Sequence, residues 1–222
     1  MLRYPPKEHV VTRDNQPGIF CLEGEWDSDL TRRLIVRPVL ELLDQLGVAQ
    51  WIHRDVATIS EFGYYLAKWV SDEYEVFPVL WLAMHGDSAA ISMSDDEDGL
   101  LTMDELEDML AGLCSGKVIY FASCSTLKED PKRLQQFAKR TGARAVIGYR
   151  KNVLWSEAAS FEMLLLQELV TRVKSNGIFK RLQEDHPVLA KRLGLVVATK
   201  NEVYRTSLRT SKALPQRRSS PV

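Results

Sequence analysis

Two side chains that can act as a nucleophile and its acid–base partner each follow an apolar stretch. His85 and Gly86 follow the apolar residues 76–84, and Cys124 follows the apolar residues 117–122. A cysteine reacts as the thiolate, and a nearby imidazole stabilises that thiolate and exchanges protons with the substrate. We expect the backbone N–H groups of Gly86 and Cys124 to hold a developing oxyanion. The pattern predicts covalent catalysis by Cys124 with His85 as its partner.

Apolar strands alternate with amphipathic helices along the chain. We expect strands at residues 18–23, 50–54, 76–84, 89–93, 117–122, 144–149 and 195–199. We expect helices at residues 29–46, 60–70, 102–111, 131–141, 156–174 and 177–192, with Pro38 and Pro187 as points of interruption. Thr102 and Glu105 form a capping-box pattern, and Gly142 is a helix stop. This order predicts an α/β fold with helices on both faces of a mostly parallel sheet of about six strands.

The carboxyl ends of parallel strands are where α/β sheets form their sites. One helix separates the strand before His85 from the strand before Cys124, which makes the two strands parallel neighbours. We therefore expect both side chains to face one cleft at the same sheet edge.

The two blocks resemble the signature of caspase-like cysteine peptidases. They read Val-Leu-Trp-Leu-Ala-Met-His-Gly, ending at Gly86, and Val-Ile-Tyr-Phe-Ala-Ser-Cys, ending at Cys124. The Thr-Gly-Ala-Arg-Ala-Val-Ile-Gly that ends at Gly148, and the Ser-Glu-Ala-Ala that begins at Ser156, are similar to the bacterial CHAT branch. The chain also looks like compact bacterial caspase-like proteins that stand alone without repeats. Over residues 19–174 the resemblance implies a three-layer α/β/α caspase-hemoglobinase sandwich, a Cys/His dyad and peptide-bond hydrolysis.

Departures from the family pattern leave the substrate preference open. Cys124 lies in Ala-Ser-Cys-Ser-Thr, not in the Gln-Ala-Cys-Arg-Gly of caspases, and Ala122 stands where metacaspases usually carry Asp. Glu157, Arg150 and Trp155 are expected near the substrate cleft. Glu157 would favour a basic residue before the cut and Arg150 an acidic one, and the likeness to the CHAT branch favours the basic residue. The short segment after Cys124 leaves little room for a cleavable linker.

Composition narrows the classes of partner. The chain of 222 residues has 29 Lys and Arg against 30 Asp and Glu, so no basic excess points to nucleic acid as the main partner. No apolar run approaches the about 20 residues that span a bilayer. Three scattered cysteines exclude a disulfide framework and favour a reducing, cytoplasmic location. The expected partners are a protein or peptide substrate and an activating partner or a second copy of the chain.

Metal and cofactor sites are weaker interpretations. Residues 94–105 place Asp96, Asp98, Gly99 and Glu105 at EF-hand positions, but Ser94 lacks the first carboxylate and a strand-like segment precedes it. A solvated acidic loop leading into a capped helix is the favoured reading. The cysteines and histidines lack zinc-ligand spacing, and His53 is read as structural. No metal and no cofactor is expected.

The chain is predicted to form one domain over residues 1–204, followed by a flexible basic tail over residues 205–222. The tail has five Lys and Arg, no acid and two Pro. Two functions remain open. The first is a cysteine endopeptidase, which could act as a regulated bacterial defence or stress protease. The second is a non-catalytic interaction module with the same fold. The relative placement of His85 and Cys124 discriminates between them.

Overall fold

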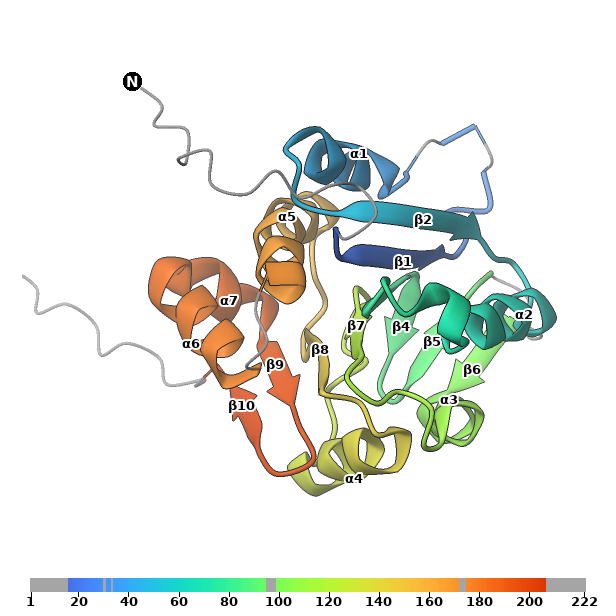
Figure 1. The fold of residues 1–222 in the computed structure, drawn as a ribbon. Helices are drawn as coiled ribbons and strands as arrows, with labels where there is room; N and C mark the ends of the chain where they lie inside the picture. The colour runs from blue at the N-terminus through green and yellow to red at the C-terminus, as the bar shows by residue number, and fades with distance from the viewer. Residues whose placement is uncertain (1–15, 30, 33, 95–98, 172–174, 207–222) are drawn as a thin grey trace, which may run out of the picture.

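The computed structural model of the chain describes residues 16–29, 31–32, 34–94, 99–171 and 175–206. Within these segments a seven-stranded sheet has the order β10-β9-β8-β7-β3-β1-β2 (Figure 1). The strands are β1 (Gly18–Glu23), β2 (Gln50–Asp55), β3 (Val79–Ala83), β7 (Val118–Phe121), β8 (Ala145–Tyr149), β9 (Leu195–Ala198) and β10 (Val203–Arg205). Strands β2, β1, β3, β7 and β8 pair in parallel, whereas β9 is antiparallel to both β8 and β10. The predicted mostly parallel sheet is confirmed, with one strand more than expected.

Helices cover both faces of the sheet and complete three layers. One face packs against α1 (Arg37–Gln45), α5 (Trp155–Thr171), α6 (Ser175–Asp185) and α7 (Pro187–Leu193), and the other against α2 (Ile59–Trp69), α3 (Met103–Leu110) and α4 (Pro131–Thr141). A 3₁₀ turn, η2 (Asp72–Tyr74), follows α2. None of the helices in the described segments has the length and apolar character needed to cross a bilayer.

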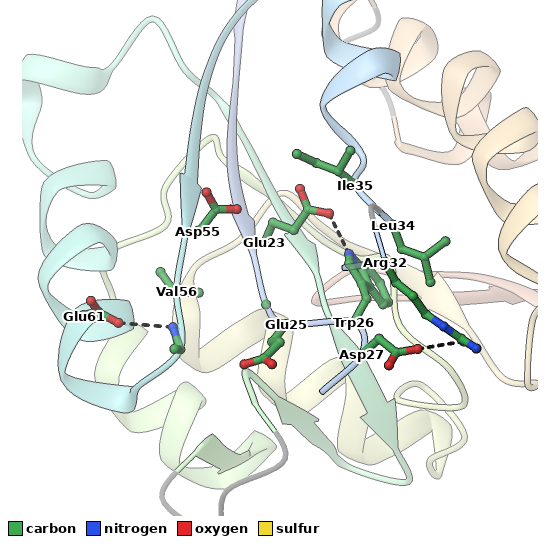
Figure 2. A pocket seen from close by; sticks show the side chains of 12 residues that line it. Glu23, Glu25, Trp26, Asp27, Arg32, Leu34, Ile35, Asp55, Val56 and Glu61 are labelled. Carbon is green, nitrogen blue, oxygen red and sulfur yellow. Dashed lines mark hydrogen bonds and ion pairs between the residues drawn. The ribbon is translucent and has the colours of Figure 1, made fainter. Parts of the chain in front are cut away.

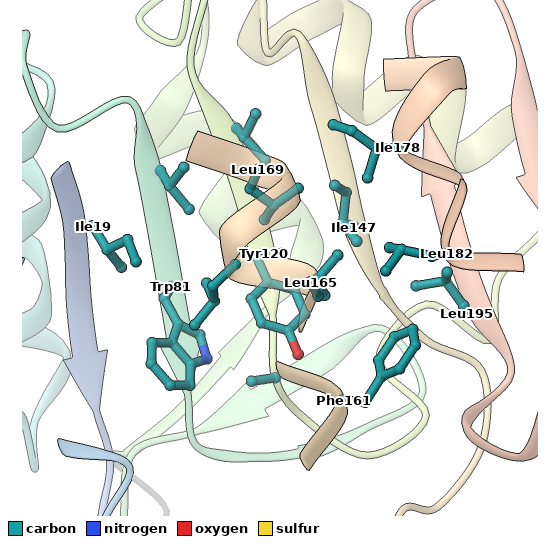
Figure 3. Packing of buried hydrophobic residues seen from close by; sticks show 14 of the residues in the cluster. Ile19, Trp81, Tyr120, Ile147, Phe161, Leu165, Leu169, Ile178, Leu182 and Leu195 are labelled. Atoms are coloured by element: carbon teal, nitrogen blue, oxygen red, sulfur yellow. The ribbon is translucent and has the colours of Figure 1, made fainter. Parts of the chain in front are cut away.

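Alternation along each strand divides the apolar side chains between the two faces. In β1, Ile19 and Cys21 belong to the core under α1 and α5, while Phe20 and Leu22 belong to the core under α2 and α3. Figure 3 shows the first of these cores, in which side chains of α5 and α6 lie over the central strands. The near-continuous apolar strands of the sequence are therefore buried on both faces, as parallel strands are.

The connection from β3 to β7 builds the edge where the site lies. It forms a small antiparallel sheet from β4 (His85–Asp87), β5 (Ala90–Ser92) and β6 (Leu100–Thr102), and then α3. Thr102 and Glu105 form the predicted capping box at the start of α3. Strands β3 and β7 are parallel neighbours, so the prediction that the strands before His85 and Cys124 are adjacent is confirmed.

The helix predicted over residues 29–46 is shorter than expected. It begins only at Arg37, with Pro38 in its first turn, where the missing proline N–H costs no helical hydrogen bond. Before it, the Asp29 carboxylate accepts hydrogen bonds from the backbone N–H and the hydroxyl of Thr31. Such local bonds favour a turn over a helix.

The predicted tail overlaps the sheet by one residue, Arg205, and the next residue is still hydrogen-bonded to β9. Arg205 pairs with Val196 at the end of β10, and the Thr206 N–H donates to the Leu195 carbonyl. A strand of three residues leaves almost no apolar periodicity in the sequence, so the sequence alone predicts no strand at residues 203–205. Residues 207–222 of the predicted tail, and Asp96 and Asp98 of the acidic loop, lie outside the described residues.

Candidate active site

Cys124 stands on a tight turn that directly follows β7. Its neighbour Ser125 has a backbone φ of 55°, in the left-handed region that residues with a Cβ seldom adopt. Hydrogen bonds hold this turn: the Ser125 N–H donates to the Lys151 carbonyl at 3.0 Å, and the Ser123 and Thr126 hydroxyls lie 2.8 Å apart. The strained turn thus presents a half-buried thiol at the carboxyl edge of the sheet.

The Cys124 sulfur accepts a hydrogen bond from the Val153 N–H at 3.4 Å. Val153 belongs to the segment between β8 and α5, so two successive strand ends converge on the thiol. The thiol also lies 3.9 Å from the Val153 carbonyl oxygen, to which its S–H can donate, so the Val153 backbone fixes the position of the sulfur.

His85 is held by a backbone carbonyl. Its Nε2 lies 2.9 Å from the Trp26 oxygen, and the Trp26 ring makes an edge contact with the imidazole at a centroid distance of 5.4 Å. Because a carbonyl oxygen only accepts, Nε2 must carry the hydrogen. This leaves Nδ1 as the nitrogen that can take and return a proton.

One cavity of about 240 Å³ brings the predicted pair together. Its lining residues come from the ends of β3 and β7, from the loop after β1, and from the start of α5: Trp26, Leu34, Val36, Met84, His85, Ala122, Ser123, Cys124, Val153, Trp155, Ala158 and Glu162. The predicted positions of Cys124, His85 and Trp155 agree with this cavity. Its walls are largely apolar, which suits a binding pocket with few polar groups.

Glu162 is the buried acid of this cavity, and the sequence interpretation missed it. Its Oε1 accepts a hydrogen bond from the Tyr120 hydroxyl at 3.0 Å, and that hydroxyl lies 2.7 Å from the Tyr149 hydroxyl. Burial raises the pKa of Glu162 to about 8, and the Tyr120 bond only partly opposes this. A signal was available: Ala158, Leu165 and Leu166 stand four residues before, three after and four after Glu162, which places it on the apolar face.

Glu157 and Arg150 do not line this cavity. The Glu157 carboxylate forms an ion pair with Arg192. The Arg150 guanidinium donates to the Thr206 carbonyl at 2.8 Å, toward β10. Glu157 lies five residues from Glu162, which is about 140° around a helix, so only one of the two can face the cavity.

Gly86 packs directly against the turn that carries Cys124. A Cβ added at Gly86 would lie 2.3 Å from the Thr126 hydroxyl oxygen and 2.6 Å from the Ser123 Cβ. Only a residue without a side chain allows this approach. The segments His85–Gly86 and Ser123–Cys124 are therefore in contact, which keeps the Gly86 backbone close to the nucleophile.

We expect the substitution Gly86→Ala to push these two segments apart. Forcing a methyl group into such a contact costs about 1–3 kcal/mol, so the melting temperature should fall by about 2–10 °C. Gly177→Ala is the matched control, because a Cβ at Gly177 meets nothing within 4 Å. Thermal unfolding followed by circular dichroism measures both variants, and equal melting temperatures would contradict the close contact.

A second cavity of about 380 Å³ adjoins the first and shares Trp26 and Leu34 with it (Figure 2). Five of its lining residues are acids, Glu23, Glu25, Asp27, Asp55 and Glu61, against one base, Arg32, which pairs with Asp27. We call it the acidic cavity.

His53, predicted to be structural, lies beside the acidic cavity. In the described part of the chain, the ligand atoms of Glu23, His53 and Asp55 lie within 4.8 Å of one another. The His53 Nε2 is only 2.6 Å from the Glu23 Oε2. Two ligands of one tetrahedral zinc ion stay about 3.3 Å apart, so these two groups are arranged as a hydrogen-bonded pair.

Comparison with known proteins agrees with this fold. The chain belongs to a family of unknown function, DUF6642, which matches residues 16–197. No protein of curated function matches the sequence. A solved structure of a secreted C11 cysteine protease from Bacteroides thetaiotaomicron, in complex with an irreversible peptide inhibitor, is similar with a TM-score of 0.52 and 10% identity. The similarity covers 84% of this chain and 67% of that chain.

The likeness to the C11 protease concerns the fold. It confirms the predicted α/β sandwich with a mostly parallel sheet, which is the caspase-like architecture. The resemblance to the CHAT branch stays a prediction drawn from the sequence.

Proposed function

We propose that this protein is a cysteine endopeptidase that uses Cys124 and His85. The observation that carries the proposal is that both residues line one cavity, at the ends of two adjacent parallel strands. The carbonyl that fixes the His85 tautomer supports it, since it leaves one ring nitrogen for proton transfer.

The chemistry follows from these positions. The Cys124 thiolate attacks the carbonyl carbon of the peptide, and the N–H groups of Gly86 and Cys124 stabilise the oxyanion. The tetrahedral intermediate collapses when protonated His85 gives a proton to the leaving amine. Water, deprotonated by His85, then hydrolyses the thioester and restores the thiolate.

The lining of the cavity favours a lysine or arginine side chain before the cut. The apolar walls match the aliphatic stem of such a side chain, and the Glu162 carboxyl matches its cationic end. An entering cation favours the ionised form of Glu162, so binding would release the proton that burial retains. This proposal gives Glu162 the role that the sequence interpretation gave to Glu157.

Profiling of cleaved proteins tests the activity. Wild type, Cys124→Ala and His85→Ala are incubated with a denatured bacterial proteome, and new amino termini are identified by mass spectrometry. We expect wild type to cut after Lys and Arg, and both variants to lose at least about 1000-fold in rate. His186→Ala, at the N-terminal end of α7 and outside the lining of the Cys124 cavity, should cut like wild type. The same new termini from wild type and Cys124→Ala would favour the non-catalytic module.

A further inference from the structure

A continuous set of hydrogen bonds joins the edge strand β2 to His85. It begins with His53 and Glu23, whose Nε2 and Oε2 atoms lie 2.6 Å apart. Their side chains are only 8% and 2% exposed. The pair is therefore shielded from water, where such a contact is stronger than on the surface.

The other carboxylate oxygen of Glu23 accepts two further hydrogen bonds. The Trp26 Nε1–H donates to it at 2.6 Å, a bond drawn in Figure 2, and the Val36 N–H donates at 2.9 Å. Val36 is the N-cap residue of α1, and its apolar side chain cannot cap the helix. One carboxylate thus fixes both the loop after β1 and the start of α1.

Trp26 connects Glu23 to His85 in the proposed active site. Its indole is anchored to Glu23, its carbonyl holds the His85 Nε2 at 2.9 Å, and its ring lies against the imidazole. Trp26 lines both cavities and is half-buried: part of its side chain packs against the core under α1 and α5, and its indole N–H is held by Glu23.

We infer that Glu23, held by His53, is a positioning residue for His85. It fixes Trp26 so that the Trp26 carbonyl keeps the imidazole in the Nε2–H tautomer, with Nδ1 left for proton transfer. The inference rests on the proposed Cys124–His85 pair. The loss of Glu23 would leave Cys124 in place but allow His85 to turn away.

The pH–rate profile of Cys124 alkylation by iodoacetamide tests this without any peptide substrate. We expect Glu23→Ala to lower the rate at pH 6.5 by about 10-fold or more, toward the rate of His85→Ala. Trp26→Phe should act in the same direction, because it removes the indole N–H and keeps a ring against His85. Glu23→Gln should keep the wild-type profile, because its amide oxygen still accepts from Trp26 and Val36.

Two further variants separate positioning from general damage. Glu23→Ala combined with His85→Ala should label at the rate of His85→Ala alone, because Glu23 acts only through His85. Asp55→Ala removes a neighbouring carboxylate that is 83% exposed and should label like wild type. Should Glu23→Ala fail to fold, Trp26→Phe and Glu23→Gln carry the test.

Each outcome decides the inference. Wild-type labelling of Glu23→Ala and Trp26→Phe, with slow labelling of His85→Ala, would overturn the positioning role and leave the proposed pair intact. Wild-type labelling of His85→Ala would instead overturn the proposed pair itself. A further loss in the double variant would show that Glu23 acts on Cys124 by another route.

Discussion

Iodoacetamide at pH 7 should alkylate Cys124 at least about 100-fold faster than Cys21 or Cys114. Burial raises the pKa of Cys21 well above its usual value, and the carboxylates of Glu23, Glu162 and Asp55 add to this. Burial raises the pKa of Cys114 to about 12, against a smaller opposing effect of Lys117. A thiol with that pKa is ionised in roughly one molecule in 100,000 at pH 7. Cys124 is half-buried and accepts a backbone N–H.

Peptide mass spectrometry after timed labelling measures the three rates. Labelling in concentrated urea is the control, because all three thiols should then react alike. Equal rates in the native protein would contradict an activated thiol at Cys124.

Substitution of Glu162 by glutamine should flatten the pH dependence of stability. The pKa of Glu162 is raised from 4.5 to about 8 by burial. Between these values the unfolded chain has lost this proton while the folded chain keeps it. The free energy of unfolding therefore falls as pH rises through this window, by about 1.4 kcal/mol per unit. From pH 5 to pH 7 wild type should lose about 2–3 kcal/mol through this group, and Glu162→Gln should lose none of it.

Urea unfolding at both pH values measures this difference. Glu157→Gln is the matched control, because it removes a carboxylate from the same helix outside the cavity. Glu162→Gln should also lower cleavage after Lys and Arg by about 100-fold, whereas Glu157→Gln should leave it unchanged. An unchanged pH dependence in Glu162→Gln would mean that Glu162 is ionised in the folded protein.

Most strands of the sheet, and the adjacency of the strands before His85 and Cys124, could be predicted because their apolar runs are strong and well bounded. Residues 79–83 and 118–121 are buried on both faces, and each leads into the polar residues that form the site. Local signals at helix ends were equally direct, as with Thr102 and Glu105 at α3 and Gly142 after α4. Cys124 and His85 followed from the rule that sites lie at the carboxyl ends of strands.

The residues that surround Cys124 and His85 could not be predicted from the sequence in the same way. The Glu162 carboxyl accepts a hydrogen bond from the Tyr120 hydroxyl, which is 42 residues away in sequence. From the sequence alone, a glutamate in a helix is ordinarily interpreted as solvated. The group that fixes His85 is the Trp26 carbonyl, 59 residues away, and a backbone carbonyl has no side-chain signature at all. Contacts of this kind depend on the tertiary structure, so the sequence alone pointed to Glu157 and not to Glu162.

The acidic cavity beside the proposed active site has a kinetic consequence. Its five carboxylates outnumber its one cation, and Trp26 and Leu34 line both this cavity and the Cys124 cavity. The excess of carboxylates favours a negative potential next to the proposed active site. Such a potential acts over about 10 Å at physiological salt, before any contact forms. It would draw cationic segments toward the cleft and turn anionic ones away during diffusion. Selection by charge would then begin in the encounter, ahead of the side-chain pocket itself.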